Sequence, residues 1–304
     1  MRKALMTAAM LLLAYGFSGP ARAIQNAASQ EPISGDWTAK VKDADGGRKL
    51  WLSLTTDKRD GREHWSQWSF DLPLDAFTGL NPNANSQTQF TLAREAGTVT
   101  FDGLFSNGRG VGEFRFAPNA SFTAAMRQLG YDDLSTEKLF SMTVHDVSTK
   151  FVNEMKQLGY DKLPASKLIS FRIFHVDREY IQAMQALGYS NLPADKLVAT
   201  RIHKVDGAFI KEIQAMGYEK PGLDKLIALR IHRVDPAFVK EMSELGYSNL
   251  SLDKLIAFRI HRVDGKFVRE MREAGYNNLS ADDLVRLRIH GVDGDYIKKM
   301  KGLK

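Results

Sequence analysis

Five histidines occupy the same position in a repeating pattern along the C-terminal part of the chain, which at first suggests metal binding. They are His145, His203, His232, His261 and His290. Equivalent positions in stacked helical repeats lie about 9–10 Å apart, whereas the ligand bonds of a zinc ion are only about 2 Å long. We therefore expect each histidine to end a helix, where its ring suits the negative end of the helix dipole. The sequence predicts no metal site and no cofactor.

A second row, of arginines, stands two residues before the histidine position, and its members are Arg172, Arg201, Arg230, Arg259 and Arg288. Guanidinium groups bind carboxylates in a fork geometry. These arginines could pair with aspartates of neighbouring repeats, or they could bind a protein or peptide partner that carries acidic groups. Under the second alternative, these five arginines are the predicted partner-binding residues. A lysine row in the same repeats is typical of solvated surface; it comprises Lys138, Lys167, Lys196, Lys225 and Lys254.

The elements that position these rows are short helices. A Gly-Tyr pair recurs at intervals of 29 residues, from Gly130-Tyr131 to Gly275-Tyr276, and an interval kept without insertion indicates stacked repeats. In one repeat, Asp235 and Pro236 suit the start of a helix, and Gly246 suits its end. Ser251 then suits the start of a second helix, which ends near His261. We predict seven first helices and six second helices, which form an α-solenoid over residues 118–304.

Residues 33–117 show a different pattern, in which apolar and polar residues alternate. This alternation predicts six strands, and turn signals such as Asn107-Gly108 separate them. Short loops favour an antiparallel meander, either a sandwich or a partly closed barrel. The predicted fold class is therefore α+β and multidomain, with a small N-terminal antiparallel β-domain followed by a solenoid of 29-residue helix-turn-helix repeats.

Tryptophans in the β-domain offer a second candidate site. Gly35-Asp36-Trp37 resembles the Gly-x-Trp opening of lipocalin-like barrels, whose interiors hold small apolar ligands. A pocket of this kind would be lined by Trp37, Trp51, Trp65 and Trp68. The alternative is that these large rings fill or cover the core.

The N-terminus indicates export. Arg2-Lys3, an apolar run and Ala21-Arg22-Ala23 are typical of a signal peptide over residues 1–23, followed by a linker over residues 24–32; a retained anchor is the alternative. The chain has no cysteine, which fits a bacterial periplasm at least as well as a eukaryotic exterior. We expect a periplasmic or secreted protein with no integral membrane segment after signal removal.

Charge and motifs narrow the functional classes. The net charge is +6, but acidic residues are interleaved with the basic ones, so we expect no nucleic-acid binding. The sequence has no His-Glu-x-x-His, Gly-x-Ser-x-Gly or phosphate-binding Gly-x-x-x-x-Gly-Lys motif. We therefore expect a protein that is not an enzyme, although a hydrolase of an unfamiliar type stays open as a minor alternative.

The phrase Leu-Gly-Tyr-x-x-Leu-x-x-x-x-Leu-x-x-x-Arg-Ile-His-x-Val-Asp, as at Leu245 to Asp264, carries a family resemblance. It is similar to repeats of bacterial exported proteins and of the extracytoplasmic C-terminal regions of BlaR-like, antibiotic-sensing membrane metallopeptidases. The segments Arg94 to Thr98, Phe101 to Gly103 and Asn107 to Gly110 resemble the region before those repeats. The resemblance implies a bacterial envelope protein, a sensor or a partner-binding module. No zinc-binding helix is present, so proteolysis does not carry over.

Together these observations predict a non-catalytic exported binding or scaffold protein, which engages a peptide or protein in the bacterial envelope through its helical repeats, in signalling for example. The alternative function is a small-ligand sensor with its pocket in the β-domain.

Overall fold

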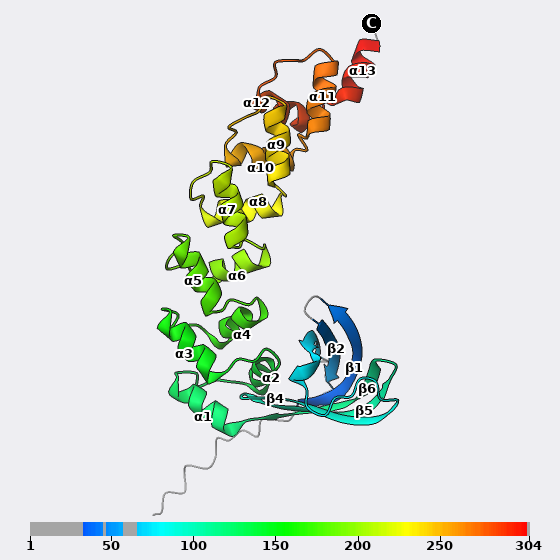
Figure 1. Ribbon diagram of the computed structural model, residues 1–304, viewed down its shortest axis with the longest axis vertical. Helices are drawn as coiled ribbons and strands as arrows, with labels where there is room; N and C mark the ends of the chain where they lie inside the picture. The colour runs from blue at the N-terminus through cyan, green and yellow to red at the C-terminus, as the bar shows by residue number, and fades with distance from the viewer. Residues whose placement is uncertain (1–32, 45–46, 57–65, 303–304) are drawn as a thin grey trace, which may run out of the picture.

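The computed structural model describes residues 33–44, 47–56 and 66–302. These residues form a six-stranded antiparallel sheet followed by thirteen α-helices in a repeated arrangement (Figure 1). The predicted signal peptide and linker lie outside the described residues, as does Trp65. None of the helices in the described ranges is both long enough and apolar enough to cross a membrane.

The six strands form one sheet in the order β3-β2-β1-β6-β5-β4. They are β1 (Ile33–Ala44), β2 (Gly47–Thr56), β3 (Gln67–Pro73), β4 (Ser86–Arg94), β5 (Gly97–Ser106) and β6 (Arg109–Pro118), and a short 3-10 turn, η1 (Leu74–Ala76), follows β3. The last strand returns to pair with the first, from Ile33 opposite Phe116 to Lys40 opposite Arg109. The sheet is thus two three-stranded meanders joined through β1 and β6, rather than the single meander expected from the short loops. Because all six strands share one curved sheet, the sandwich alternative does not apply.

The concave core of the sheet is built around Trp37, whose side chain is 1% exposed. Its ring centroid lies 5.3 Å from that of Phe90, and its Nε1 donates a hydrogen bond of 3.1 Å to the Asp102 carbonyl. Gly103 and Gly110 lie directly beneath the ring: a Cβ atom at these positions would lie 2.8 Å and 2.7 Å from it. Glycine at these two positions therefore lets the indole pack flat against the backbone.

The thirteen helices alternate between two layers, as the 29-residue period predicts. First helices are α1 (Ala120–Gln128), α3 (Thr149–Gln157), α5 (Arg178–Ala186), α7 (Gly207–Ala215), α9 (Pro236–Glu244), α11 (Gly265–Glu273) and α13 (Gly294–Gly302). Second helices are α2 (Thr136–Val144), α4 (Ala165–Ile173), α6 (Ala194–Ile202), α8 (Leu223–Ile231), α10 (Leu252–Ile260) and α12 (Ala281–Ile289). The seven-plus-six prediction is confirmed.

The predicted caps explain where the helices begin and end. The Asp235 carboxylate accepts a hydrogen bond of 2.8 Å from the backbone N–H of Phe238, which fixes the start of α9. Gly246 has φ +80°, and the next N–H, that of Tyr247, bonds to the Met242 carbonyl at 2.9 Å. This is the Schellman arrangement, in which a left-handed residue ends the helix.

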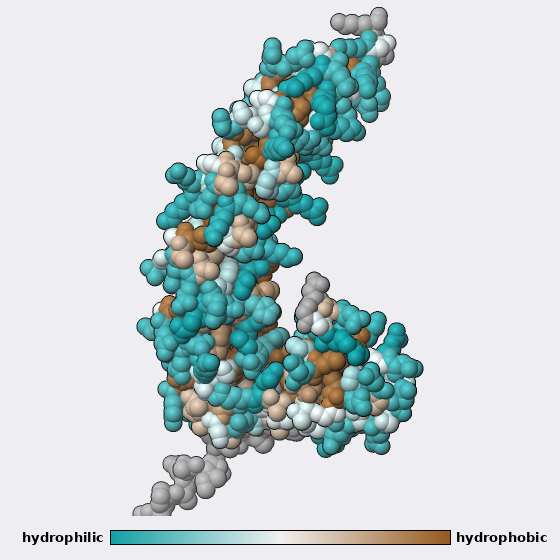
Figure 2. Space-filling model, viewed as in Figure 1, coloured by the Kyte–Doolittle hydropathy of each residue, from teal (hydrophilic) through white to brown (hydrophobic). Residues whose placement is uncertain are grey.

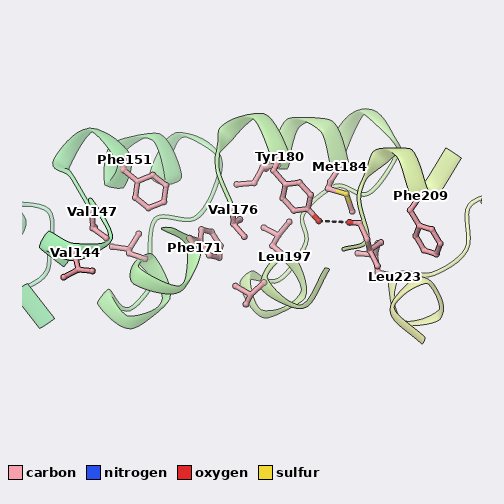
Figure 3. Close-up of a cluster of buried hydrophobic side chains, with 14 of the residues drawn as sticks. Val144, Val147, Phe151, Phe171, Val176, Tyr180, Met184, Leu197, Phe209 and Leu223 are labelled. Atoms are coloured by element: carbon pink, nitrogen blue, oxygen red, sulfur yellow. Dashed lines mark hydrogen bonds between the residues drawn. The ribbon is translucent and has the colours of Figure 1, made fainter. Parts of the chain in front are cut away.

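The array is held together by a continuous apolar core between its two layers (Figure 3). Phe151, Phe171, Leu197 and Phe209 are each at most 5% exposed, and burying such side chains stabilises by about 1.5–3 kcal/mol each. Polar links cross the repeats as well. The Tyr218 hydroxyl, for example, donates a hydrogen bond to the carbonyl of Leu250 in the next repeat, and the hydroxyls of Tyr160, Tyr189 and Tyr247 do the same at Leu192, Pro221 and Leu279.

The sheet and the array are joined by direct packing. Helix α2 lies against the sheet (Figure 1), and the Phe140 ring packs 5.0 Å from Trp68 and 5.3 Å from Phe116 between centroids. The Glu95 carboxylate accepts hydrogen bonds from the backbone N–H (2.8 Å) and the hydroxyl (2.6 Å) of Thr149, at the start of α3. The first repeat is therefore fixed to the β-domain.

Candidate functional site

The five arginines of the predicted binding row pack against neighbouring aromatic rings. Arg230 is representative: its Cζ lies 3.8 Å from the ring centroid of Phe209, and its Nε donates a hydrogen bond of 3.0 Å to the Lys204 carbonyl. A cationic guanidinium over an aromatic face is a stabilising arrangement. The corresponding rings are Phe151, Tyr180, Phe238 and Phe267, which lie under Arg172, Arg201, Arg259 and Arg288.

The same arginines also bind the turn that follows the preceding second helix. Arg172 donates to the His145 carbonyl (3.0 Å) and pairs with the Asp146 carboxylate (2.9 Å). Arg201 and Arg259 lie 3.8 Å from the carboxylates of Asp177 and Asp235, and Arg288 donates to the carbonyl of Arg262. The side chains of Arg172, Arg201 and Arg259 are only 30–32% exposed. These contacts join the repeats, so the arginine row is engaged within the array.

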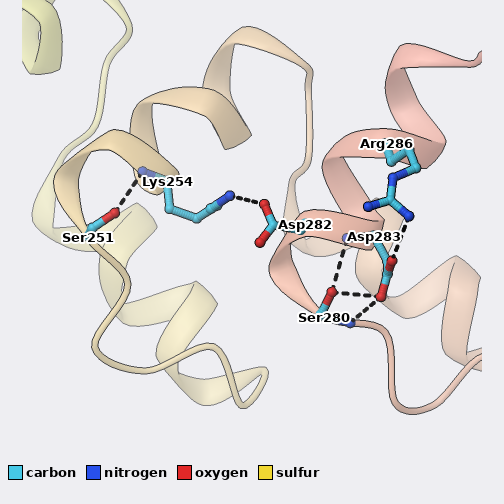
Figure 4. Close-up of polar contacts among 6 residues, drawn as sticks. All are labelled: Ser251, Lys254, Ser280, Asp282, Asp283 and Arg286. Carbon is cyan, nitrogen blue, oxygen red and sulfur yellow. Dashed lines mark hydrogen bonds and ion pairs between the residues drawn. The ribbon is translucent and has the colours of Figure 1, made fainter.

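The lysine row is not plain solvated surface, because four of its members are ion-paired between repeats. Each lysine binds the aspartate that begins the next second helix, and the pairs are Lys167–Asp195, Lys196–Asp224, Lys225–Asp253 and Lys254–Asp282. Figure 4 shows the last of these pairs beside the capping box of Ser280 and Asp283. The result is a ladder of charges along the beginnings of the second helices.

The histidines lie where the helix-end interpretation places them. His145, His203, His232, His261 and His290 are the C-cap residues of α2, α6, α8, α10 and α12. Burial, and then the positive charge of Arg172, lower the pKa of His145. Across the described ranges, no three His, Asp or Glu side chains are grouped so that they could hold a metal ion.

The tryptophans do not come together at one pocket. Trp37 is enclosed in the sheet core, and Trp68 packs on Phe140 at the junction with α2. Trp51 stands opposite Lys40 in the β1–β2 register, which places it on the other face of the sheet from Trp37, and the Lys42 Nζ lies 5.0 Å from its ring centroid. The described members of this predicted set therefore pack separately.

A row of exposed isoleucines forms a more distinctive surface, and the sequence interpretation did not single it out. Ile173, Ile202, Ile231, Ile260 and Ile289 end successive second helices and are 42%, 48%, 52%, 51% and 57% exposed. We call this row the isoleucine stripe. Exposed apolar side chains that recur at the same position of successive repeats can mark an interaction site. The sequence did contain a signal for this surface. An isoleucine directly follows each arginine of the row, at a helix position that does not belong to the buried apolar face.

The β-domain already covers the first position of this surface. In α2 the residue equivalent to the stripe is Val144, which is 3% exposed, and the residue one turn before it is Phe140, which is fully buried. Phe140 packs against the sheet, and α2 contacts β4, β5 and β6. Isoleucine or valine occupies the Phe140 position in the later second helices, namely Ile169, Val198, Ile227, Ile256 and Val285. The stripe thus continues an existing apolar interface.

A second row runs beside the stripe and consists of Lys204, Arg233 and Arg262, which we call the basic row. Each residue follows a stripe isoleucine by two positions and is exposed. Their side chains make no hydrogen bond or ion pair with the residues that the structure describes. All three adopt left-handed backbone conformations, with φ of 54°, 54° and 56°. Such a conformation costs a residue with a side chain about 1–2 kcal/mol relative to glycine.

The stripe begins at an open cleft of about 490 Å³ between the sheet and the array. Phe70 and Leu72 of the edge strand β3 line one side, and Arg172, Ile173 and His175 line the other. Figure 2 shows the hollow between the two parts of the molecule, and apolar patches that alternate with polar ones along the array. The cleft gives a ligand access to the stripe beside the β-domain.

Comparisons with protein families, with curated proteins and with solved structures found no match to this chain.

Proposed function

We propose that this protein is a non-catalytic binding protein of the bacterial envelope, exported to the periplasm or secreted, that engages a peptide or protein partner through the isoleucine stripe. The observation that carries the proposal is the stripe itself, five isoleucines that are 42–57% exposed on a face whose first position is covered by the sheet. Solenoids commonly bind partners along such extended surfaces. The N-terminal pattern and the resemblance of the repeats to exported proteins support the location.

The isoleucine stripe is a better candidate for partner binding than the arginine row of Arg172 to Arg288. Those guanidinium groups are bound to rings, carbonyls and carboxylates of adjacent turns. The side chains of the isoleucine stripe and of the basic row are instead exposed. Because the basic row is positively charged, the partner is still expected to carry acidic groups, as it was for the arginine row.

Capture of partners from an envelope extract tests the proposal. The triple variant Ile202→Ser, Ile231→Ser and Ile260→Ser should lose the proteins or peptides that the wild type captures. Leu104→Ser with Val111→Ser is the matched control, because these residues are 58% and 56% exposed on the sheet, away from the stripe. Equal capture by the wild type and the triple variant would overturn the proposal.

A further inference from the structure

We infer that the ligand of the isoleucine stripe is an extended acidic peptide, in polyproline II conformation, with an apolar residue at every third position. This inference rests on the proposed function and names its partner.

The stripe is narrow. Each second helix from α4 to α12 contributes one exposed isoleucine, at its last residue. The lysine–aspartate pairs occupy the beginnings of the same helices, and the basic row follows their ends. The apolar surface is therefore about one side chain wide and bordered by charge, which suits a single peptide chain rather than the broad face of a folded domain.

The spacing of the stripe selects the conformation of that chain. Successive second helices pack directly on one another, and packed helices lie about 8–10 Å apart. A polyproline II helix rises about 3.1 Å per residue with three residues per turn, so every third side chain returns to the same side after about 9.3 Å. A β-strand alternates its faces every residue, and its third residue along would point away from the stripe.

The positive charge of the basic row favours an acidic residue beside each apolar residue of the peptide. Lys204, Arg233 and Arg262 follow Ile202, Ile231 and Ile260 by two positions and are unpaired among the described residues. The equivalent residues of the other repeats are Asp146, His175 and Gly291, which also have positive φ, so this turn does not itself require a basic residue. Three successive basic residues at this position place positive charge along the middle of the stripe, and carboxylates of a ligand are the complementary groups.

The isoleucine stripe is continuous with an interface already formed. Phe140 and Val144 of α2 are buried, and Phe140 packs on the sheet, so this face of a second helix accepts apolar side chains. A peptide that enters at the cleft beside Ile173 would cover the same positions in the later repeats.

Fluorescence anisotropy with labelled synthetic peptides tests this inference. The probe is (Ile-Glu-Pro)5, whose proline holds the preceding residue in an extended conformation. The controls are a scrambled 15-mer of the same composition without the three-residue period, (Ser-Glu-Pro)5, (Ile-Lys-Pro)5 and an acidic helical peptide with one isoleucine per heptad. We expect (Ile-Glu-Pro)5 to bind at least tenfold more tightly than each control.

Variants locate the binding. Binding of (Ile-Glu-Pro)5 should weaken at least tenfold in the triple variant Ile202→Ser, Ile231→Ser and Ile260→Ser. If the triple variant does not fold, the single variant Ile231→Ser should still bind the peptide measurably more weakly than the wild type. Lys204→Glu, Arg233→Glu and Arg262→Glu together should reverse the preference toward (Ile-Lys-Pro)5. The Leu104→Ser and Val111→Ser pair should leave binding unchanged.

Four results would overturn the inference: equal binding of the scrambled peptide, tighter binding of the helical peptide, displacement of the probe by oligo(dT), or a dimer in sedimentation that depends on the stripe. In these cases, the proposed function would still hold if capture of partners from envelope extract requires the stripe isoleucines. If capture does not require them, the proposed function and the peptide inference would both be wrong.

Discussion

Replacing Arg230 by alanine separates the two roles considered for the arginine row, because its side chain contacts both a ring and a carbonyl of the preceding repeat. The change removes a guanidinium that lies 3.8 Å from the Phe209 ring centroid and a hydrogen bond of 3.0 Å to the Lys204 carbonyl. A cation–π contact contributes about 0.5–1 kcal/mol at a partly exposed site, and the hydrogen bond contributes roughly 0.5–1.5 kcal/mol. We expect Arg230→Ala to lower the free energy of unfolding by about 1–2.5 kcal/mol, as the sum of these two contributions.

Arg233 is the matched control, three residues away in the same repeat, because it is exposed and has no partner among the described residues. Arg233→Ala should change stability by less than about 0.5 kcal/mol while weakening the acidic peptide. Urea unfolding followed by circular dichroism measures the first quantity, and peptide anisotropy measures the second. The reasoning fails if Arg230→Ala unfolds at the wild-type midpoint, or if Arg233→Ala is the more destabilising of the two.

Three further changes test other parts of the structure. Gly110→Ala would place a Cβ atom 2.6 Å from the Phe105 ring and 2.7 Å from the Trp37 ring, so overpacking should destabilise the β-domain by about 1–3 kcal/mol and shift tryptophan emission to longer wavelength; unchanged emission would contradict the packing described. Tyr218→Phe removes the hydroxyl that bonds to the Leu250 carbonyl and should cost about 0.5–1.5 kcal/mol in thermal or urea unfolding. Burial lowers the pKa of His145 in the folded state, so its contribution to stability is complete above the unfolded pKa, near about 6.5, and is lost as the pH falls. His145→Phe, which copies the residue found in the next repeat, should therefore flatten the decline in stability between about pH 7 and pH 5, and an unchanged pH profile would count against this origin.

Local chemistry predicted the array almost completely. The Gly-Tyr period placed the ends of the first helices from α1 to α11, because glycine at a left-handed position stops a helix wherever it occurs. Aspartate and serine likewise placed the N-caps, as at Asp206 and Ser251. These signals act over four or five residues, so neighbouring sequence is sufficient to recognise them.

The parts that sequence did not predict depend on contacts between distant residues. The pairing of Ile33 with Phe116, which sets the strand order, leaves no local pattern in either strand. The environment of the candidate site residues is equally non-local: whether Arg230 or Arg233 is bound within the protein depends on the preceding repeat. Likewise, Ile231 and its neighbour Leu229 are both apolar, yet they are 52% and 0% exposed. Only the stacking of the helices separates a surface side chain from a core one.

The repeats contact their immediate neighbours and are linked by bonds of constant sequence separation, such as each tyrosine hydroxyl to a carbonyl 32 residues later. Removing or adding one whole 29-residue unit therefore preserves every local contact type, while any other insertion breaks the register. Each added or removed unit adds or removes one isoleucine of the stripe, so the length of the exposed apolar row is set by the number of repeats.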